Sequence, residues 1–372
     1  MKKQTRITRY EQFIRNEFAG GLTKNKEYCM SKLDGKLRDD IVSGKFKQVV
    51  FTGMGCSAIV SDLIKGFFIE SGVPVYVDVV NDYEFDYLMN TKSKNVEETL
   101  FIISSYSGFS KEPIIAYKNI KKLSDNIILL TSGGDLEQLG LDNNESIINW
   151  RLTNPDREYP LFHAHQYFAI ILDIFHKLNI LPSNYEEELR ATSDHLETMV
   201  QSPQINESAI QIARRLSGGD VLLMASPKWY QILLKLVKMH FNEISMTPAH
   251  RNYIHEFCHS EVAVFTDPML KHGILHFQDE EDEYTKAKTD NLESLLTANI
   301  SQNQNIEFIR VKVEGKDFFH KLFSTLLYVQ LVVLEMGSIN NTKSRDLIST
   351  AAGNVWYSLD SVKKDGGDIN YG

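Results

Sequence analysis

The chain has 372 residues, of which 42% are hydrophobic and 24% are charged, and its formal net charge is −9. This length exceeds what one hydrophobic core usually spans, so we expect two domains of roughly 150–200 residues each. The acidic balance excludes the strongly basic surface by which proteins bind nucleic acid. The three cysteines, Cys29, Cys56 and Cys258, form neither a disulfide framework nor a CxxC metal motif, which favours a reducing cytoplasm.

No targeting or membrane-spanning segment is expected. The basic N-terminal stretch lacks the apolar run of about 7–15 residues that is typical of a secretory signal. The longest apolar stretch, at 326–334, is shorter than the ~20 residues that cross a bilayer. The sequence therefore predicts a soluble, cytoplasmic protein with no membrane partner.

The first half alternates short apolar runs with amphipathic stretches. Strands are predicted at 48–52, 73–80, 99–104 and 126–131, and helices at 57–71, 111–123 and 162–178. Apolar runs separated by helical segments are typical of βαβ units, whose parallel sheet is covered on both faces. Right-handed crossovers then give a three-layer α/β sandwich.

The same alternation resumes after a polar connector at 183–205. Helices are predicted at 209–216, 227–244 and 318–336, and strands at 220–225, 274–278 and 307–311. The acidic run at 279–283 is interpreted as a solvated loop. The α/β layout is thus predicted twice, with domains at 1–182 and 206–340 and a C-terminal tail at 341–372.

The most specific chemical signal is the run Ser105-Tyr106-Ser107-Gly108-Phe109-Ser110 between a strand and a helix. Free N–H groups and the positive end of the helix dipole favour an anion at this place. The hydroxyls add neutral donors that suit a phosphate monoester. A serine-rich turn with an ordinary N-cap is the alternative, and the local pattern does not decide between the two.

The second signal is Gly53-Met54-Gly55-Cys56-Ser57, which also stands between a strand and a helix. Its glycines permit a tight turn and a close approach of the backbone to a ligand. A dinucleotide site is a second interpretation. It would use Ala58 at the sixth position of the GxGxxG fingerprint and Asp78 as the acidic residue.

The third signal is a carboxylate and an imidazole 16 residues apart, Glu243 and His259. Both types of side chain can be tuned to transfer protons near neutral pH. A zinc site made by His255, His259 and Glu261 is an alternative, although HxxxH lacks the glutamate of the HExxH motif. A helix-terminal acid with surface histidines is the third interpretation.

Together these segments resemble the sugar isomerase (SIS) domain family, in particular its double-domain members. GMGCSAI followed by SYSGFSKE is similar to the GMGGS and SYSGNT segments of the bifunctional phosphoglucose/phosphomannose isomerases. It is also similar to the phosphate loop of the glucosamine-6-phosphate synthase isomerase domain. FNEIS and HEFCHSEV resemble the family's N-E and E-L-x-H-N-E segments. The resemblance implies two SIS-type three-layer α/β/α sandwich domains, each with a mainly parallel sheet of five strands.

The resemblance further implies an aldose–ketose isomerase of a sugar phosphate, which needs no metal or cofactor. Glu243 would move a proton between C1 and C2 through a cis-enediol, and His259 of its own or the neighbouring subunit would assist ring opening. A homodimer would build its sites at the subunit interface. The residues implied to hold the phosphate are Ser57, Ser105, Ser107 and Ser110, and those implied to complete the substrate site are Gly55, Cys56, Tyr106 and Gly108.

Three positions depart from the family pattern. Phe109-Ser110 replaces Asn-Thr, Pro160-Leu161 lacks the arginine of a Pro-Arg segment, and Ser349 stands at the position of a C-terminal lysine. Two alternative functions therefore stay open. One is a sugar-phosphate amine deaminase or deglycase, which would use the same base, and the other is a non-catalytic regulator that binds a sugar phosphate. The sequence does not identify the sugar.

Overall fold

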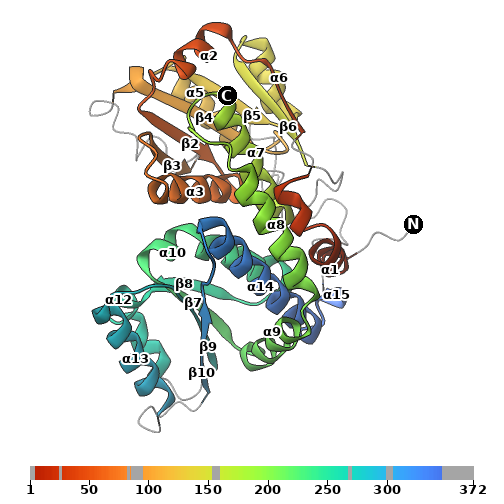
Figure 1. Cartoon of the computed structure of the whole chain (residues 1–372), viewed down its shortest axis with the longest axis vertical. Helices are drawn as coiled ribbons and strands as arrows, with labels where there is room; N and C mark the ends of the chain where they lie inside the picture. Colours follow the sequence, from red (N-terminus) through yellow and green to blue (C-terminus); the bar gives the residue numbers. More distant parts are fainter. Residues whose placement is uncertain are drawn as a thin grey trace, which may run out of the picture.

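The computed structural model describes residues 5–24, 27–81, 84, 95–152, 160–266, 270–298 and 305–345. Most of the predicted C-terminal tail, with Ser349, lies outside these residues. Figure 1 shows two sheets, one above the other, each with helices on both of its faces. The predicted fold class, two α/β/α layers built on mainly parallel sheets, is therefore confirmed.

The first sheet has the strand order β1-β6-β5-β4-β2-β3. Five strands are parallel: β2 (Gln48–Gly53), β3 (Tyr76–Asn81), β4 (Thr99–Ser105), β5 (Ile127–Thr131) and β6 (Ser146–Arg151). The edge strand β1 (Glu27–Lys32) pairs with β6 in the antiparallel direction. Every residue of β4 and β5 is buried, as expected where helices cover both faces of a parallel sheet.

The helices of the first half pack on both faces of this sheet. They are α2 (Gly35–Val42), α3 (Gly55–Glu70), α5 (Lys111–Lys121), α6 (Gly134–Asp142) and α7 (Ala164–Lys177). A 3₁₀ turn, Pro160–His163, leads into α7. The predicted helices and strands of this half are confirmed to within a few residues at their ends.

The second sheet contains four parallel strands among the described residues, in the order β10-β9-β7-β8, where five were expected. These are β7 (Asp220–Ala225), β8 (Ala249–Tyr253), β9 (His272–Gln278) and β10 (Ile306–Lys312). Its helices form two groups in Figure 1. One group holds α8 (Glu186–Gln201), α9 (Pro203–Leu216) and α14 (Phe318–Ile339), and the other holds α12 (Ile254–Phe257) and α13 (Glu283–Thr297).

The predicted single helix at 227–244 is wrong, because the segment forms three pieces. These are α10 (Pro227–Ile232), α11 (Leu234–His240) and a π-helical turn, η5 (Phe241–Ser245). A π turn inserts one extra residue into the helical repeat, and such turns are frequent at functional sites. The change of repeat alters which face the last residues present.

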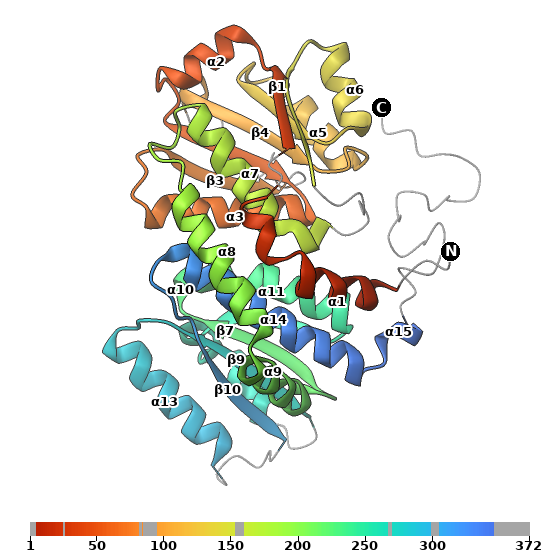
Figure 2. The same ribbon diagram turned by 45° about the vertical axis from the view of Figure 1, so that its right-hand side comes forward.

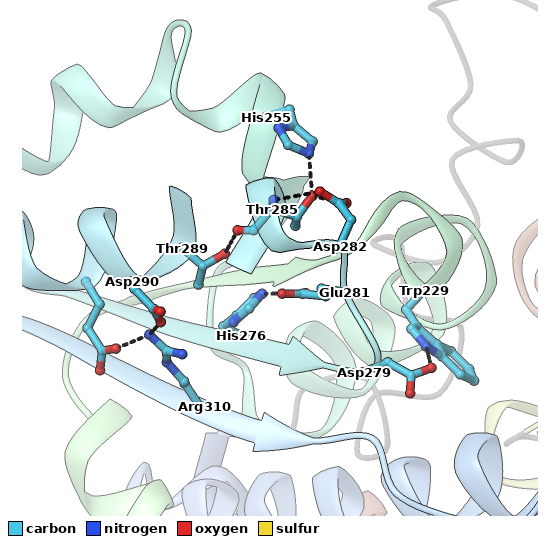
Figure 3. A network of polar contacts seen from close by, with 11 residues as sticks. Trp229, His255, His276, Asp279, Glu281, Asp282, Thr285, Thr289, Asp290 and Arg310 are labelled. Atoms are coloured by element: carbon cyan, nitrogen blue, oxygen red, sulfur yellow. Dashed lines mark hydrogen bonds and ion pairs between the residues drawn. The ribbon is translucent and has the colours of Figure 1, made fainter. Parts of the chain in front are cut away.

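The acidic run at 279–283 is not simply a solvated loop, as Figure 3 shows. Asp279 accepts hydrogen bonds from Trp229 Nε1 and Lys321 Nζ, each at 2.7 Å. The Glu281 side chain is buried beside His276, with 3.5 Å between Oε1 and Nε2. Asp282 caps α13 by accepting a hydrogen bond from the backbone N–H of Thr285. Asp279 thus ties the end of β9 to α10 and α14, and Asp282 stabilises the start of α13.

Helix α14 is long and apolar enough to cross a membrane by length and composition alone. However, 78% of its most apolar 18-residue window is buried inside the fold. It packs against α8, α9 and α1 (Arg6–Asn16). Its apolar character is therefore that of a core helix, which covers one face of the second sheet.

Helix α3 joins the two halves by packing against α10 and α11. Gly66 lies so close to Ile232 that a side chain at this position would collide with it. Two ion pairs flank the contact, Lys235–Asp62 at 2.9 Å and Lys228–Glu70 at 2.8 Å. The contact fixes the N-terminus of α3 relative to the second half of the chain.

Helix α1 lies beside α14 and the π turn, as Figure 2 shows. Its Tyr10 and Phe13 are buried, and they pack among three buried histidines, His163, His165 and His240. Burial lowers the pKa of His163 to about 4 and the pKa values of His165 and His240 to about 3. The folded protein therefore holds all three imidazoles neutral at physiological pH.

Because these three histidines are buried in the neutral form, we predict that the free energy of unfolding falls in acid. Between pH 6.5 and about 4 the unfolded chain binds protons that the folded chain does not. Stability that is present above pH 6.5 should therefore fall by about 1.4 kcal/mol per pH unit for each histidine. The free energy of unfolding in urea would be measured between pH 7 and pH 5. The His240→Gln substitution should reduce the number of protons taken up on unfolding by about one, and with it the pH dependence of that free energy. The matched control is His250→Gln, which removes an exposed imidazole that lies outside this cluster. Equal slopes for His240→Gln and the wild type would contradict the interpretation.

Candidate active site

The glycine-containing loop between β2 and α3 lies where two neighbouring strands end. Gly53 approaches the carbonyl of Ser104 on β4, and a Cβ at this position would lie 2.8 Å from that oxygen. Gly55 begins α3 with a φ of +55°, in the left-handed region that glycine tolerates best. Ser57 lies in the first turn of α3 and is 7% exposed. The sequence thus places an open helix N-terminus at the carboxyl end of the sheet.

The serine loop between β4 and α5 lies beside it, because β2 and β4 are adjacent parallel strands. Ser105 is buried at the end of β4, Ser107 is exposed, and Ser110 occupies the N-cap of α5. The Ser110 hydroxyl makes no capping hydrogen bond with its own helix. Two helix N-termini and several hydroxyls therefore meet at one edge of the sheet. This arrangement favours the binding of an anion.

Contacts with the next loop hold the backbone of the serine loop. The carbonyl of Tyr106 accepts hydrogen bonds from the N–H and the hydroxyl of Ser132, at 2.9 and 2.6 Å. Gly108 has a φ of +71°, and its carbonyl accepts a hydrogen bond from Leu136 N at 2.9 Å. A Cβ at Gly108 would overlap the carbonyl of Gly133. The loop conformation therefore requires glycine at this position.

Tyr106 lies in the loop but directs its side chain into the core. Its ring is 6% exposed and packs against Trp150 with 4.6 Å between the ring centroids. Its hydroxyl accepts a hydrogen bond from Leu152 N at 3.4 Å. The backbone of Tyr106, rather than its side chain, therefore belongs to the surface of the loop. Its role in substrate binding stays a prediction.

Glu243 projects from the π turn η5 and is partly exposed, with 28% of its side chain accessible. The flanking Phe241, Ile244 and Ser245 are buried and anchor the turn. Asn340 at the end of α14 donates hydrogen bonds to the carbonyl of Ser245 and to the Thr247 hydroxyl, at 2.9 and 3.1 Å. The turn is therefore rigidly held while its carboxylate stays accessible.

Cys56 links the glycine loop to Glu243. Burial, with a smaller contribution from the negative charge of Glu243, raises the pKa of the Cys56 thiol to about 12. The Cys56 Sγ also donates to the carbonyl of Pro160 at 3.4 Å. The carboxylate of the second half thus lies near the glycine loop of the first half.

His259 lies elsewhere in the same subunit. It is exposed and follows α12, whose Phe257 packs in a core with α13. Phe241 and Ile244 of the π turn pack instead in the core formed with α14. The five residues of β8 also separate the two segments, about 16 Å of extended chain. The structure of one subunit therefore does not bring His259 to Glu243.

The alternative zinc ligands do not converge in the described residues, where no group of three or more His, Cys, Asp or Glu side chains is placed to hold a metal ion. His255 bonds to the Thr285 hydroxyl at 3.1 Å and stacks on Tyr284 (Figure 3). Asp78, the acid of the dinucleotide alternative, forms an ion pair with Lys65 at 3.1 Å.

Sequence reasoning missed one residue of the site, Arg6. Its guanidinium on α1 contacts the Glu243 carboxylate, with 3.3 Å between Nη1 and Oε2. The two residues are 237 positions apart, and no motif surrounds Arg6. No local signal could have paired them.

Comparisons with known proteins agree with this arrangement. Residues 205–346 match the family described as the bacterial phospho-glucose isomerase C-terminal SIS domain. The bifunctional phosphoglucose/phosphomannose isomerase of Thermoplasma volcanium is 24% identical over 82% of this chain and 89% of its own length. The enzyme of the same name from Caldicellulosiruptor bescii is 26% identical over 78% of this chain and 84% of its own.

A solved structure shows the same fold at lower identity. The C-terminal domain of glucosamine-fructose-6-phosphate aminotransferase from Francisella tularensis is 14% identical. The likeness covers 90% of this chain and 96% of that one, with a TM-score of 0.58. The resemblance to double SIS-domain proteins that the two loops and the Glu243 segment indicated is therefore confirmed.

Gly108 provides a test of the serine loop. Gly108→Ala adds about 1–2 kcal/mol of left-handed backbone strain and about 1–3 kcal/mol from the overlap with Gly133. Gly72→Ala is the matched control, since Gly72 also has a positive φ (+63°) but has open space around it. Gly108→Ala should therefore lower the melting temperature more and weaken the binding of inorganic phosphate, measured by calorimetry. Equal effects of the two substitutions would show that the loop does not need glycine.

Proposed function

Because residues 205–346 match a SIS domain and the chain is related over most of its length to phosphoglucose/phosphomannose isomerases, we propose that it is an aldose–ketose isomerase of a sugar phosphate. The substrates we favour are glucose 6-phosphate and mannose 6-phosphate, with fructose 6-phosphate as the common product. The observation that carries this proposal is the packing of α3, which begins at the glycine loop, against α11, which continues into the turn that bears Glu243.

The phosphate group would bind at the two helix N-termini. Backbone N–H groups at the start of α3 and α5 lie at the carboxyl edge of the sheet. They favour the binding of a phosphate dianion there. The hydroxyls of Ser57, Ser105, Ser107 and Ser110 would add neutral donors, with the backbone of Gly55, Cys56 and Gly108 close by. Such a site holds a phosphate without a cluster of cationic side chains.

The proton transfer would then fall to Glu243. In the open-chain aldose the C1 carbonyl acidifies the hydrogen on C2, so a carboxylate can remove it while O1 takes up a proton, which gives a cis-enediol. Return of the proton to C1, with loss of the proton on O2, gives the ketose. Because C2 is oxidised as C1 is reduced within the same molecule, the reaction needs no external electron acceptor. The partial exposure of Glu243 fits this role, since the carboxylate must be reached by the substrate.

Ring opening would use His259 of a second subunit. Within one subunit His259 and the π turn pack on different cores, so a homodimer is the simplest way to bring them together. Each loop also carries an exposed apolar side chain, Met54 (44% exposed) and Phe109 (64% exposed), which a second subunit would cover. We therefore place the site at the interface of a homodimer.

The remaining expectations follow from this assignment. The curated relatives are isomerases, so the deaminase or deglycase and the non-catalytic regulator are not favoured. The cysteines Cys29, Cys56 and Cys258 are free thiols, which fits a cytoplasmic enzyme.

Glu243→Gln tests the role of the base. The substitution keeps the size of the side chain but removes the proton acceptor, so kcat should fall by about 10²–10⁴-fold with little change in KM. Exchange of the C2 hydrogen in deuterated water should disappear in parallel. Glu197→Gln, at an exposed carboxylate, is the control. A Glu243→Gln enzyme with normal turnover would exclude Glu243 as the base.

Mixing two inactive variants tests the shared site. Glu243→Gln and His259→Ala subunits, unfolded and refolded together, should form heterodimers with one intact site each. With random pairing, about one quarter of the wild-type activity should return. No recovery, with heterodimers present by native mass spectrometry, would place His259 in the site of its own subunit or outside any site.

A further inference from the structure

Arg6 approaches the proposed base from outside the two α/β units. It lies in the first turn of α1 and is 5% exposed, whereas the Glu243 side chain is 28% exposed. The contact of 3.3 Å between Nη1 and Oε2 joins a buried cation to a partly exposed carboxylate. Taking the guanidinium out of water costs free energy, and an ionised Glu243 offsets part of this cost.

A second contact fixes the same two elements. Tyr10, one helical turn after Arg6, has its hydroxyl 3.0 Å from His240 Nδ1, and both residues are fully buried. His240 precedes Glu243 by three residues, at the end of α11. Arg6 and Tyr10 thus contact the π turn and the helix before it from one face of α1. Two anchors one turn apart restrict both the position and the rotation of the turn.

The surroundings of Glu243 explain why a guanidinium is useful there. The family pattern carries an arginine after a proline, and this chain has Leu161 after Pro160. The Pro160 carbonyl accepts a hydrogen bond from the Cys56 Sγ. The negative charge of Glu243 contributes to the raised pKa of the same thiol. Arg6 brings a guanidinium to Glu243 from another element.

We propose that Arg6 is a positioning residue that holds the Glu243 carboxylate ionised and oriented for proton transfer between C1 and C2. This inference rests on the proposed isomerase function. Arg6 keeps its own charge throughout, and Glu243 alone gains and loses the proton. Arg6 from α1 contacts the Glu243 carboxylate, and Cys56 from α3 lies within the reach of its charge. Tyr10 from α1 and His240 from α11 bond to each other beside the π turn.

The test compares Arg6→Gln and Arg6→Lys with the control Arg15→Gln. Arg15 lies on the same helix, is 41% exposed and, among the described residues, pairs with its neighbour Glu11. Loss of the Arg6 charge should lower kcat by about 10–100-fold with KM changed less than about threefold. The acidic limb of the pH profile of kcat/KM should move up by about one pH unit or more. Arg6→Lys should keep the position of that limb but recover kcat only in part, because an ammonium lacks the planar fork of a guanidinium.

A second measurement does not depend on turnover. The ¹³C NMR titration of the Glu243 carboxyl, assigned by its absence in Glu243→Gln, should move to higher pH in Arg6→Gln but not in Arg15→Gln. Circular dichroism identifies variants that do not fold, and Arg6→Lys keeps the test informative if Arg6→Gln is one of them. Unchanged kcat and pH profile, or an unmoved titration, would overturn the role of Arg6. A wild-type protein without isomerisation would overturn the proposed function instead, while the titration still decides the role of Arg6.

Discussion

The close contact of α3 with α10 and α11 is the constraint on which the site depends. Gly66 lets α3 approach Ile232, and the Lys235–Asp62 ion pair holds the helices in register. The N-terminus of α3 carries the glycine loop, and α11 continues into the π turn. One packing contact therefore sets the separation between the anion-binding loops and the carboxylate. A side chain at position 66 would separate them without touching either.

The charge of −9 at first appears to oppose an anionic ligand. The geometry removes the conflict, because the donors at the carboxyl edge of the first sheet are backbone N–H groups and hydroxyls. Such donors act within hydrogen-bonding distance, whereas net charge acts over a Debye length of about 8–10 Å. The acidic balance therefore excludes a polyanion more strongly than it excludes one small phosphate ester. It also fits a site in which the cation that contacts the base, Arg6, is buried.

The sequence predicted the parts of the fold that are buried on both faces. Strands such as β4 and β5 are uninterrupted apolar runs, so they could be placed without a structure. The strands β1, β6 and β8 were missed. Both β1 and β8 are edge strands with partly exposed, polar residues, and β6 has no more than two consecutive apolar residues although it lies inside the sheet. The π turn was missed for another reason, since an apolar helical pattern does not reveal a local change of repeat. The contact between Arg6 and Glu243 joins residues 237 positions apart and depends on tertiary packing alone.

Helix α1 also shows why the two halves cannot be treated as independent units. It precedes the first sheet in the chain, yet it packs on α14 and the π turn of the second half. Its Tyr10 and Phe13 also contact Phe162, at the entrance to α7 of the first half. The element that holds the proposed base is therefore tied to both halves by buried aromatic contacts. Because these contacts tie both halves to α1, they hold the proposed base and the proposed phosphate loops in one arrangement.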